Sequence, residues 1–109
     1  MPYVNFHNLT QKQIMDVSKD ILEDIARIVD CPTDWFCFNG IAGFSIIDNE
    51  LRDDVCYVKV EWFKRDEETI EKVTNLIDES LRKIGIKETV ITFSDLDKKK
   101  YFEEGKRVE

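Results

Sequence analysis

PYVNFH at residues 2–7 and CYVKVE at residues 56–61 are the two stretches that decide the fold. In both, apolar side chains alternate with polar or aromatic ones, and this period of two is typical of a strand with one buried face. The Tyr-Val pair at positions 3 and 4 recurs 54 positions later, at positions 57 and 58. We therefore expect each half of the chain to begin with a similar strand, the first over residues 2–7 and the second over residues 56–63.

An amphipathic helix is predicted after each of these strands. Thr10 and Gln13 have the spacing of a capping box, and Pro32 requires the first helix to end by about residue 30. Asp66 suits the start of the second helix and Gly85 its end. The apolar positions of the two helices lie 56 positions apart, and pair Ile14, Val17, Ile21, Ile25 and Ile28 with Ile70, Val73, Ile77, Leu81 and Ile84. This match favours a duplicated β-α-β unit over a chance alignment of two helices.

The remaining segments complete each unit. A short strand is expected at 35–38, followed by a turn around Gly40 and Gly43. An extended piece at 44–47 and a turn at 48–50 predict a hairpin in the middle of the chain, and a β-branched strand at 89–93 and a tail over 94–109 complete it. The prediction is one α+β domain over residues 1–109, with repeats over about 2–47 and 55–109. Both helices would cover one face of a four-stranded mixed sheet. The pattern leaves open whether each helix returns to an adjacent parallel strand or to a separated one, as in a ferredoxin-like sandwich.

Composition excludes several function classes. The chain has 16 basic and 23 acidic residues among 109, so its formal net charge of −7 repels nucleic-acid phosphates and anionic membranes. No apolar run approaches the roughly 18 residues of a membrane span, and we expect a cytoplasmic protein. The three cysteines show no C-x-x-C spacing, and the four glycines match no phosphate-binding loop. No metal site and no cofactor are predicted.

Pro2 is the first candidate for chemistry, because it follows the initiator methionine and starts the first strand. Removal of Met1 would leave a secondary amine on a rigid strand end. An ordinary α-amino group has a pKa of roughly 7.7 to 8.0, and burial or a nearby cation would lower the pKa of the Pro2 amine. The amine would then be a base at neutral pH.

A duplicated β-α-β chain that opens with Met-Pro resembles the tautomerase superfamily, which includes 4-oxalocrotonate tautomerase and macrophage migration inhibitory factor, and in particular a bacterial branch with two fused repeats. The resemblance covers nearly the whole chain. It implies that Pro2 is the general base and acid of a keto-enol isomerase, that the substrate is a small enolisable carbonyl acid, and that the active unit is a homotrimer.

Two further segments match the superfamily. KRDEE at residues 64–68 resembles the segment that carries a substrate-binding arginine before a helix, which implies this role for Arg65. YFEEG at residues 101–105 resembles a tail hairpin whose phenylalanine walls the pocket, which implies that Phe102 is the wall and that Tyr101 adds a polar group beside it. In a trimer, Arg65 would have to reach the Pro2 pocket of a neighbouring subunit.

The chain also departs from the superfamily pattern. No arginine follows the first strand, where residues 8–12 are NLTQK, and none lies in the predicted strand at 35–38. The first repeat therefore lacks a substrate clamp. The strand at 35–38 lacks the second carboxylate-binding arginine of the members that use dicarboxylates, which argues against a dicarboxylate substrate. The alternative function is a non-catalytic oligomer, on this or a ferredoxin-like fold, that binds a small ligand or a protein. A normal pKa of the Pro2 amine and no turnover of enols would favour that alternative.

Overall fold

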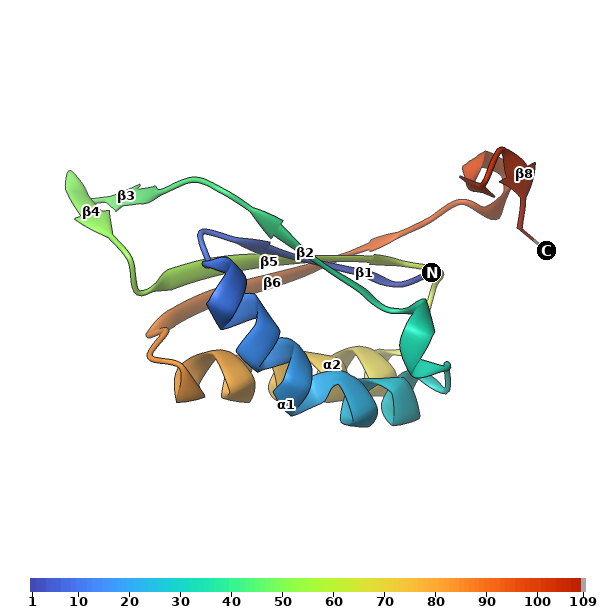
Figure 1. Ribbon diagram of the computed structural model, residues 1–109, viewed down its shortest axis with the longest axis horizontal. Coiled ribbons are helices and arrows are strands. Elements are labelled where there is room, and N and C mark those ends of the chain that lie inside the picture. Colours follow the sequence, from blue (N-terminus) through green and yellow to red (C-terminus); the bar gives the residue numbers. More distant parts are fainter. Residues whose placement is uncertain (109) are drawn as a thin grey trace.

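The computed structural model describes residues 1–108, and both of its helices lie on one face of a four-stranded sheet (Figure 1). The opposite face of the sheet carries no helix. Hydrogen bonding joins the strands in the order β2-β1-β5-β6. The elements that build this body are β1 (Tyr3–His7), α1 (Gln11–Val29), β2 (Cys37–Ile41), β5 (Val55–Trp62), α2 (Glu67–Lys83) and β6 (Glu88–Asp95).

Strand direction distinguishes the two architectures that the sequence left open. β1 pairs in parallel with β2, β5 pairs in parallel with β6, and β1 and β5 run antiparallel at the centre of the sheet. Each helix therefore returns the chain to the strand next to the one it left. This order excludes the ferredoxin-like alternative and confirms the predicted α+β fold of two β-α-β units.

The core lies between the sheet and the helices, where the repeat pattern predicted it. The three central helix pairs of the repeat, at an offset of 56, are fully buried, and the two terminal pairs pack against them. The fully buried members are Val17, Ile21 and Ile25 in α1 and Val73, Ile77 and Leu81 in α2. On β1 and β5 the inward side chains, which include Val4, Phe6, Val58 and Val60, are buried as well. The duplication is therefore a duplication of core positions.

Local signals set both helix starts as expected. The Thr10 hydroxyl accepts a hydrogen bond from the backbone N–H of Gln13 at 3.1 Å, and the Gln13 side chain accepts one from the N–H of Thr10 at 2.8 Å. Asp66 accepts a hydrogen bond from the N–H of Thr69 at 2.8 Å. Gly85 follows α2 with a φ of +94°, which glycine adopts without steric strain. The predicted caps are confirmed.

The second strand differs from its prediction. It runs from Cys37 to Ile41 instead of 35–38, because Thr33–Trp35 forms a turn of 3-10 helix, η1, after Pro32. Gly40 was assigned to a turn and instead lies within β2. A Cβ atom there would lie 2.7 Å from Cδ1 of Ile14, so glycine allows α1 to pack closely on this strand.

Two small hairpins extend from the body. β3 (Ser45–Ile47) and β4 (Glu50–Arg52) are joined by Asp48 and Asn49, which both have positive φ. The turn and the hairpin were predicted, but the bounds of β4 were not. β7 (Phe102–Glu103) and β8 (Lys106–Arg107) follow a 3-10 turn, η2 (Lys98–Lys100). Figure 1 shows the β3-β4 hairpin and the β7-β8 tail at opposite ends of the long axis, with the N-terminus nearer the tail.

None of the helices within residues 1–108 combines the length and the apolar character needed to cross a membrane.

Candidate functional site

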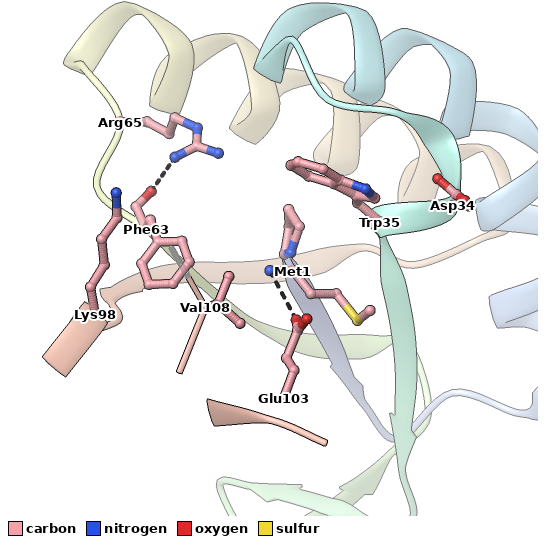
Figure 2. A pocket seen from close by; sticks show the side chains of 9 residues that line it. Met1, Asp34, Trp35, Phe63, Arg65, Lys98, Glu103 and Val108 are labelled. Atoms are coloured by element: carbon pink, nitrogen blue, oxygen red, sulfur yellow. Dashed lines mark hydrogen bonds and ion pairs between the residues drawn. The ribbon is translucent and has the colours of Figure 1, made fainter. Parts of the chain in front are cut away.

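A cavity of about 450 Å³ lies at the end of the sheet where the chain begins (Figure 2). The start of the chain, η1, the segment after β5 and the C-terminal tail all contribute side chains to it. Its lining consists of Met1, Pro2, Asp34, Trp35, Phe63, Arg65, Lys98, Glu103 and Val108. The cavity therefore combines apolar walls with two cationic and two acidic side chains.

Pro2 is buried and lines this cavity. Its carbonyl accepts a hydrogen bond from the N–H of Cys37 at 3.0 Å, directly before the parallel pairing of β1 with β2 begins. This bond ties the first residues to the sheet, so position 2 is not part of a frayed terminus.

Arg65 lines the same cavity as Pro2 within one chain. Its guanidinium donates hydrogen bonds to the carbonyls of Phe63 at 2.6 Å and Lys64 at 3.3 Å, and contacts Sγ of Cys31 at 3.7 Å. It also lies 5.7 Å from the centre of the Trp62 ring, within cation-π distance. The expectation that Arg65 must reach the pocket of a neighbouring subunit is wrong, because the fold brings the residue that follows β5 beside the start of β1.

Tyr101 lies beside the cavity and contacts Phe63, Glu103 and Tyr3. Its ring packs edge-on against Phe63, with centroids 5.1 Å apart. Its hydroxyl donates a hydrogen bond to Oε1 of Glu103 at 2.6 Å and lies 3.0 Å from the hydroxyl of Tyr3. Burial raises the pKa of Tyr101, and the hydrogen bonds to Glu103 and Tyr3 raise it further. The phenol is therefore neutral over the physiological range.

Glu103 extends this contact chain to the N-terminus. Its Oε1 lies 3.7 Å from the amino nitrogen of Met1, the only N-terminal ion pair within residues 1–108. Figure 2 shows the carboxylate pointing at that nitrogen. The carboxylate thus lies next to the position where removal of one residue would leave the Pro2 amine.

Phe102 does not line the cavity in a single chain. Its side chain is 52% exposed, and the Arg107 guanidinium covers one face of the ring at 4.9 Å. Side chains alternate along β7, so Glu103 faces the cavity and the adjacent Phe102 faces away. Within one chain, the structure brings together Pro2, Arg65 and the neighbourhood of Tyr101, and leaves Phe102 outside.

A family profile described as "Domain of unknown function (DUF1904)" matches residues 1–107. The chain belongs to this family. A crystal structure of a DUF1904 domain from Sebaldella termitidis superposes with a TM-score of 0.87 at 28% identity, covering 96% of this chain and 97% of that one. No curated protein matches the chain at a significant level.

Two solved structures from outside this family share the fold of the chain. The macrophage migration inhibitory factor-like protein of Entamoeba histolytica superposes with a TM-score of 0.80 at 6% identity, covering 98% of each chain. Pt0534, inactivated by 2-oxo-3-pentynoate, superposes with a TM-score of 0.76 at 12% identity, covering 95% of this chain and 93% of that one. The DUF1904 protein therefore has the tautomerase-like fold that its Met-Pro opening and repeat suggested.

Sequence reasoning missed several residues that line the DUF1904 cavity. Trp35 was placed in a strand, Glu103 had no role, and Lys98 was placed in the tail without a role in this site. The three come from separate segments that only the folded chain brings together. One signal was available for Lys98, because it stands in a tail that lacks helical or strand periodicity, where functional residues often occur. Within residues 1–108 no cluster of metal-ligating side chains is present.

Proposed function

We propose that this DUF1904 protein is a cofactor-free tautomerase or isomerase of a small enolisable carbonyl acid, with the Pro2 amine as its general base and acid. The observation that carries the proposal is that a buried Pro2 lines a cavity together with the cationic Arg65. The tautomerase-like fold supports it, as does the inactivation of the fold neighbour Pt0534 by a 2-oxo acid.

The chemistry requires that Met1 be removed. The nitrogen of Pro2 is an amide while Met1 is attached, and it becomes a secondary amine once Met1 is lost. That amine would take a proton from the carbon next to the substrate carbonyl and return it to another atom of the same enolate, so no proton is gained or lost overall. Arg65 would pair with the substrate carboxylate.

The cavity exerts opposing influences on the amine. Burial of Pro2 and the cations Arg65 and Lys98 disfavour the ammonium form, and the Glu103 carboxylate favours it. We expect burial and the two cations to prevail and to lower the pKa of the Pro2 amine below its ordinary range of about 7.7 to 8.0. Tyr101, held neutral against Glu103, would place its hydroxyl at the rim of the site.

A homotrimer would give the exposed Phe102 a role. An aromatic side chain that lies outside the cavity of its own chain can wall the cavity of a neighbour when subunits pack around an axis. We therefore assign Phe102 to the pocket of an adjacent copy. This assignment follows from the superfamily resemblance, whereas the placement of Arg65 needs no second copy.

The decisive test begins with the intact mass of protein purified from cells, which reports whether Met1 is gone. Turnover of enolisable 2-oxo acids such as phenylpyruvate is then measured for the unmodified chain and for Pro2→Ala. Alanine also permits methionine removal but replaces the rigid secondary amine by a primary one. We expect Pro2→Ala to lower kcat/KM by about 100-fold, the lower range for loss of a general base. Retention of Met1, or equal turnover by both proteins, would refute the proposal and leave a ligand-binding role.

A further inference from the structure

The positively and negatively charged side chains of the cavity lie on different sides of it. Figure 2 shows Arg65 and Lys98 on the same side, next to the ring of Phe63, while Glu103 and Asp34 lie on other sides of the opening. A ligand with one anionic end is therefore attracted to one side only. A second anionic end would face the two carboxylates.

The two cations differ in how far the protein already uses them. Arg65 makes two hydrogen bonds to backbone carbonyls and one contact with a sulfur atom, and it lies over the Trp62 ring. Lys98 makes no hydrogen bond or ion pair with its ammonium group among the residues that the structure describes. Its Nζ lies 5.4 Å from the centre of the Phe63 ring. An ammonium group has three donors, and none of those of Lys98 is used within residues 1–108, whereas Arg65 has already committed part of its five to its own chain.

The backbone that carries Lys98 is fixed although its side chain is not engaged. The N–H of Leu96 donates to the carbonyl of Trp62 at 2.7 Å, which extends the pairing of β5 and β6 past the strand end. Asp97 then caps η2 by accepting from the N–H of Lys99 at 2.9 Å, and Arg107 donates to the carbonyl of Lys99 at 2.7 Å. These bonds hold the base of the Lys98 side chain at the rim of the cavity, so little ordering of backbone is needed when a ligand binds.

An exposed tryptophan supplies the apolar part of the site. Trp35 lines the cavity from η1, and its side chain is 52% exposed. Phe63 lines the cavity under Lys98. Aromatic side chains of this size gain most by covering a flat apolar group.

From these observations we infer that Lys98 anchors the anionic group of the ligand, and that the ligand is a small monoanion whose flat apolar body packs on Trp35. The inference deepens the proposed function and rests on it for the choice of the cavity. It moves the main anion contact from Arg65, which its own chain holds, to a lysine at the tail. Lys98 is thus a specificity-determining residue for carboxylates over neutral analogues.

The test measures binding without turnover. The probe is 3-phenylpropanoate, which has a flat body and one carboxylate but no enolisable carbonyl, and its neutral analogue is 3-phenylpropanamide. Binding is followed by tryptophan fluorescence, because Trp35 lines the cavity and Trp62 is buried in the core. Trp35→Phe removes the signal from the cavity and identifies its source. Calorimetry replaces fluorescence for that variant.

Lys98→Gln is compared with Lys99→Gln and Lys100→Gln, which remove the same charge from the same turn but from side chains that do not line the cavity. We expect Lys98→Gln to weaken 3-phenylpropanoate binding about fivefold, as for a partly solvated ion pair, and to leave amide binding unchanged. The two control variants should bind both probes as the parent does. We also expect phenylsuccinate, which has a second carboxylate, to bind no more tightly than 3-phenylpropanoate.

An equal loss of 3-phenylpropanoate affinity in all three lysine variants would overturn the inference, because Lys98 would then act only through the net charge of the protein. Equal loss of acid and amide binding would also overturn it. Pro2→Ala separates this outcome from failure of the proposed function. If Pro2→Ala turns over 2-oxo acids as well as the parent while Lys98→Gln alone weakens the acid, the catalytic proposal fails and the anion site stands. If Pro2→Ala loses turnover while Lys98→Gln binds the acid as the parent does, the catalytic proposal stands and Lys98 is not the anion contact.

Discussion

At the scale of single residues, the three thiols differ in their surroundings. Cys56 is fully buried in β5, and burial raises the pKa of its thiol to about 11. Cys31 and Cys37 are half-buried. Because the thiolate is the reactive form, we expect Cys56 to remain unmodified by a disulfide reagent at pH 8 in the folded protein. At most two thiols should react before denaturant is added, and the third only after unfolding.

The measurement is a thiol count with and without guanidinium. Cys56→Ser serves as the control, since it should leave the native count unchanged and lower the denatured count by one. Reaction of three thiols in the folded protein would show that β5 opens locally, and would contradict the buried state of this strand.

The candidate residues that could be predicted from sequence are those with a local reason to be where they are. Pro2 is identified by its position after Met1, and Arg65 by its position between a strand and a helix cap. Lys98 and Glu103 have no such local reason. They reach the cavity because η2 and β7 fold back toward the start of the chain, which is a consequence of tertiary packing. Glu103 contacts Met1, 102 positions away in sequence, and Lys98 lies over the ring of Phe63, 35 positions away.

At the scale of elements, the packing of α1 on β2 depends on Gly40. An alanine Cβ there would lie 2.7 Å from Cδ1 of Ile14, the flexible end of that side chain. We expect Gly40→Ala to lower the free energy of unfolding by about 1 kcal/mol, the lower range for overpacking. Ile14→Val removes the clashing methyl group and should restore part of that loss.

A double-mutant cycle by urea denaturation tests this contact. Ile14→Val alone should destabilise by about 1 kcal/mol, as is typical of a deleted methyl group, so a favourable coupling between the two changes is the diagnostic result. If the two losses simply add, the tight approach of Ile14 to β2 does not limit stability.

The bounds of the two long helices were predicted well from their apolar periodicity. The bounds of the short strands were not, because they depend on the strands with which they pair. Both helices follow from apolar spacing over 17 or more residues and from caps that lie next to them in sequence. β2 is shorter, and its start is set by pairing with β1 and by the η1 turn, neither of which leaves a periodic signal. β4 has three residues with no buried member, so nothing in its own sequence distinguishes it from a loop.

At the scale of the whole molecule, the duplication explains the fold, and the positions at which the two repeats differ explain the site. At the strand offset of 54, Pro2 corresponds to Cys56, and both positions are buried. Cys56 lies inside a strand and can never have a free amine, whereas the removal of Met1 that we propose would give Pro2 one. The segment that carries Arg65 after β5 has no arginine counterpart after β1, where residues 8–12 are NLTQK. Within residues 1–108 the two repeats therefore share one core, while the cavity at the start of β1 takes an arginine from the second repeat alone.

The face of the sheet without helices is where we expect copies of the chain to meet. Val90 lies on it, because its register partner Tyr57 is exposed while the neighbours of Tyr57 in β5 are buried. The Val90 side chain is 56% exposed. Asn5 is buried on the same face, and its side-chain amide makes hydrogen bonds with Lys59, Glu61 and Asn39. Its polar groups therefore need no water when the face is covered.

We therefore expect light scattering to report a mass of three chains, and expect Val90→Asp to reduce it, because a charge buried at an interface without a partner is strongly unfavourable. Met15→Asp is the matched control, since Met15 is 50% exposed on α1, which packs on the opposite face of the sheet. This variant should keep the parent mass, and circular dichroism should confirm that both variants remain folded. A parent protein that is monomeric, or a Val90→Asp variant with the parent mass, would show that the subunits do not meet at this face. Phe102 would then have no neighbouring cavity to wall through this packing.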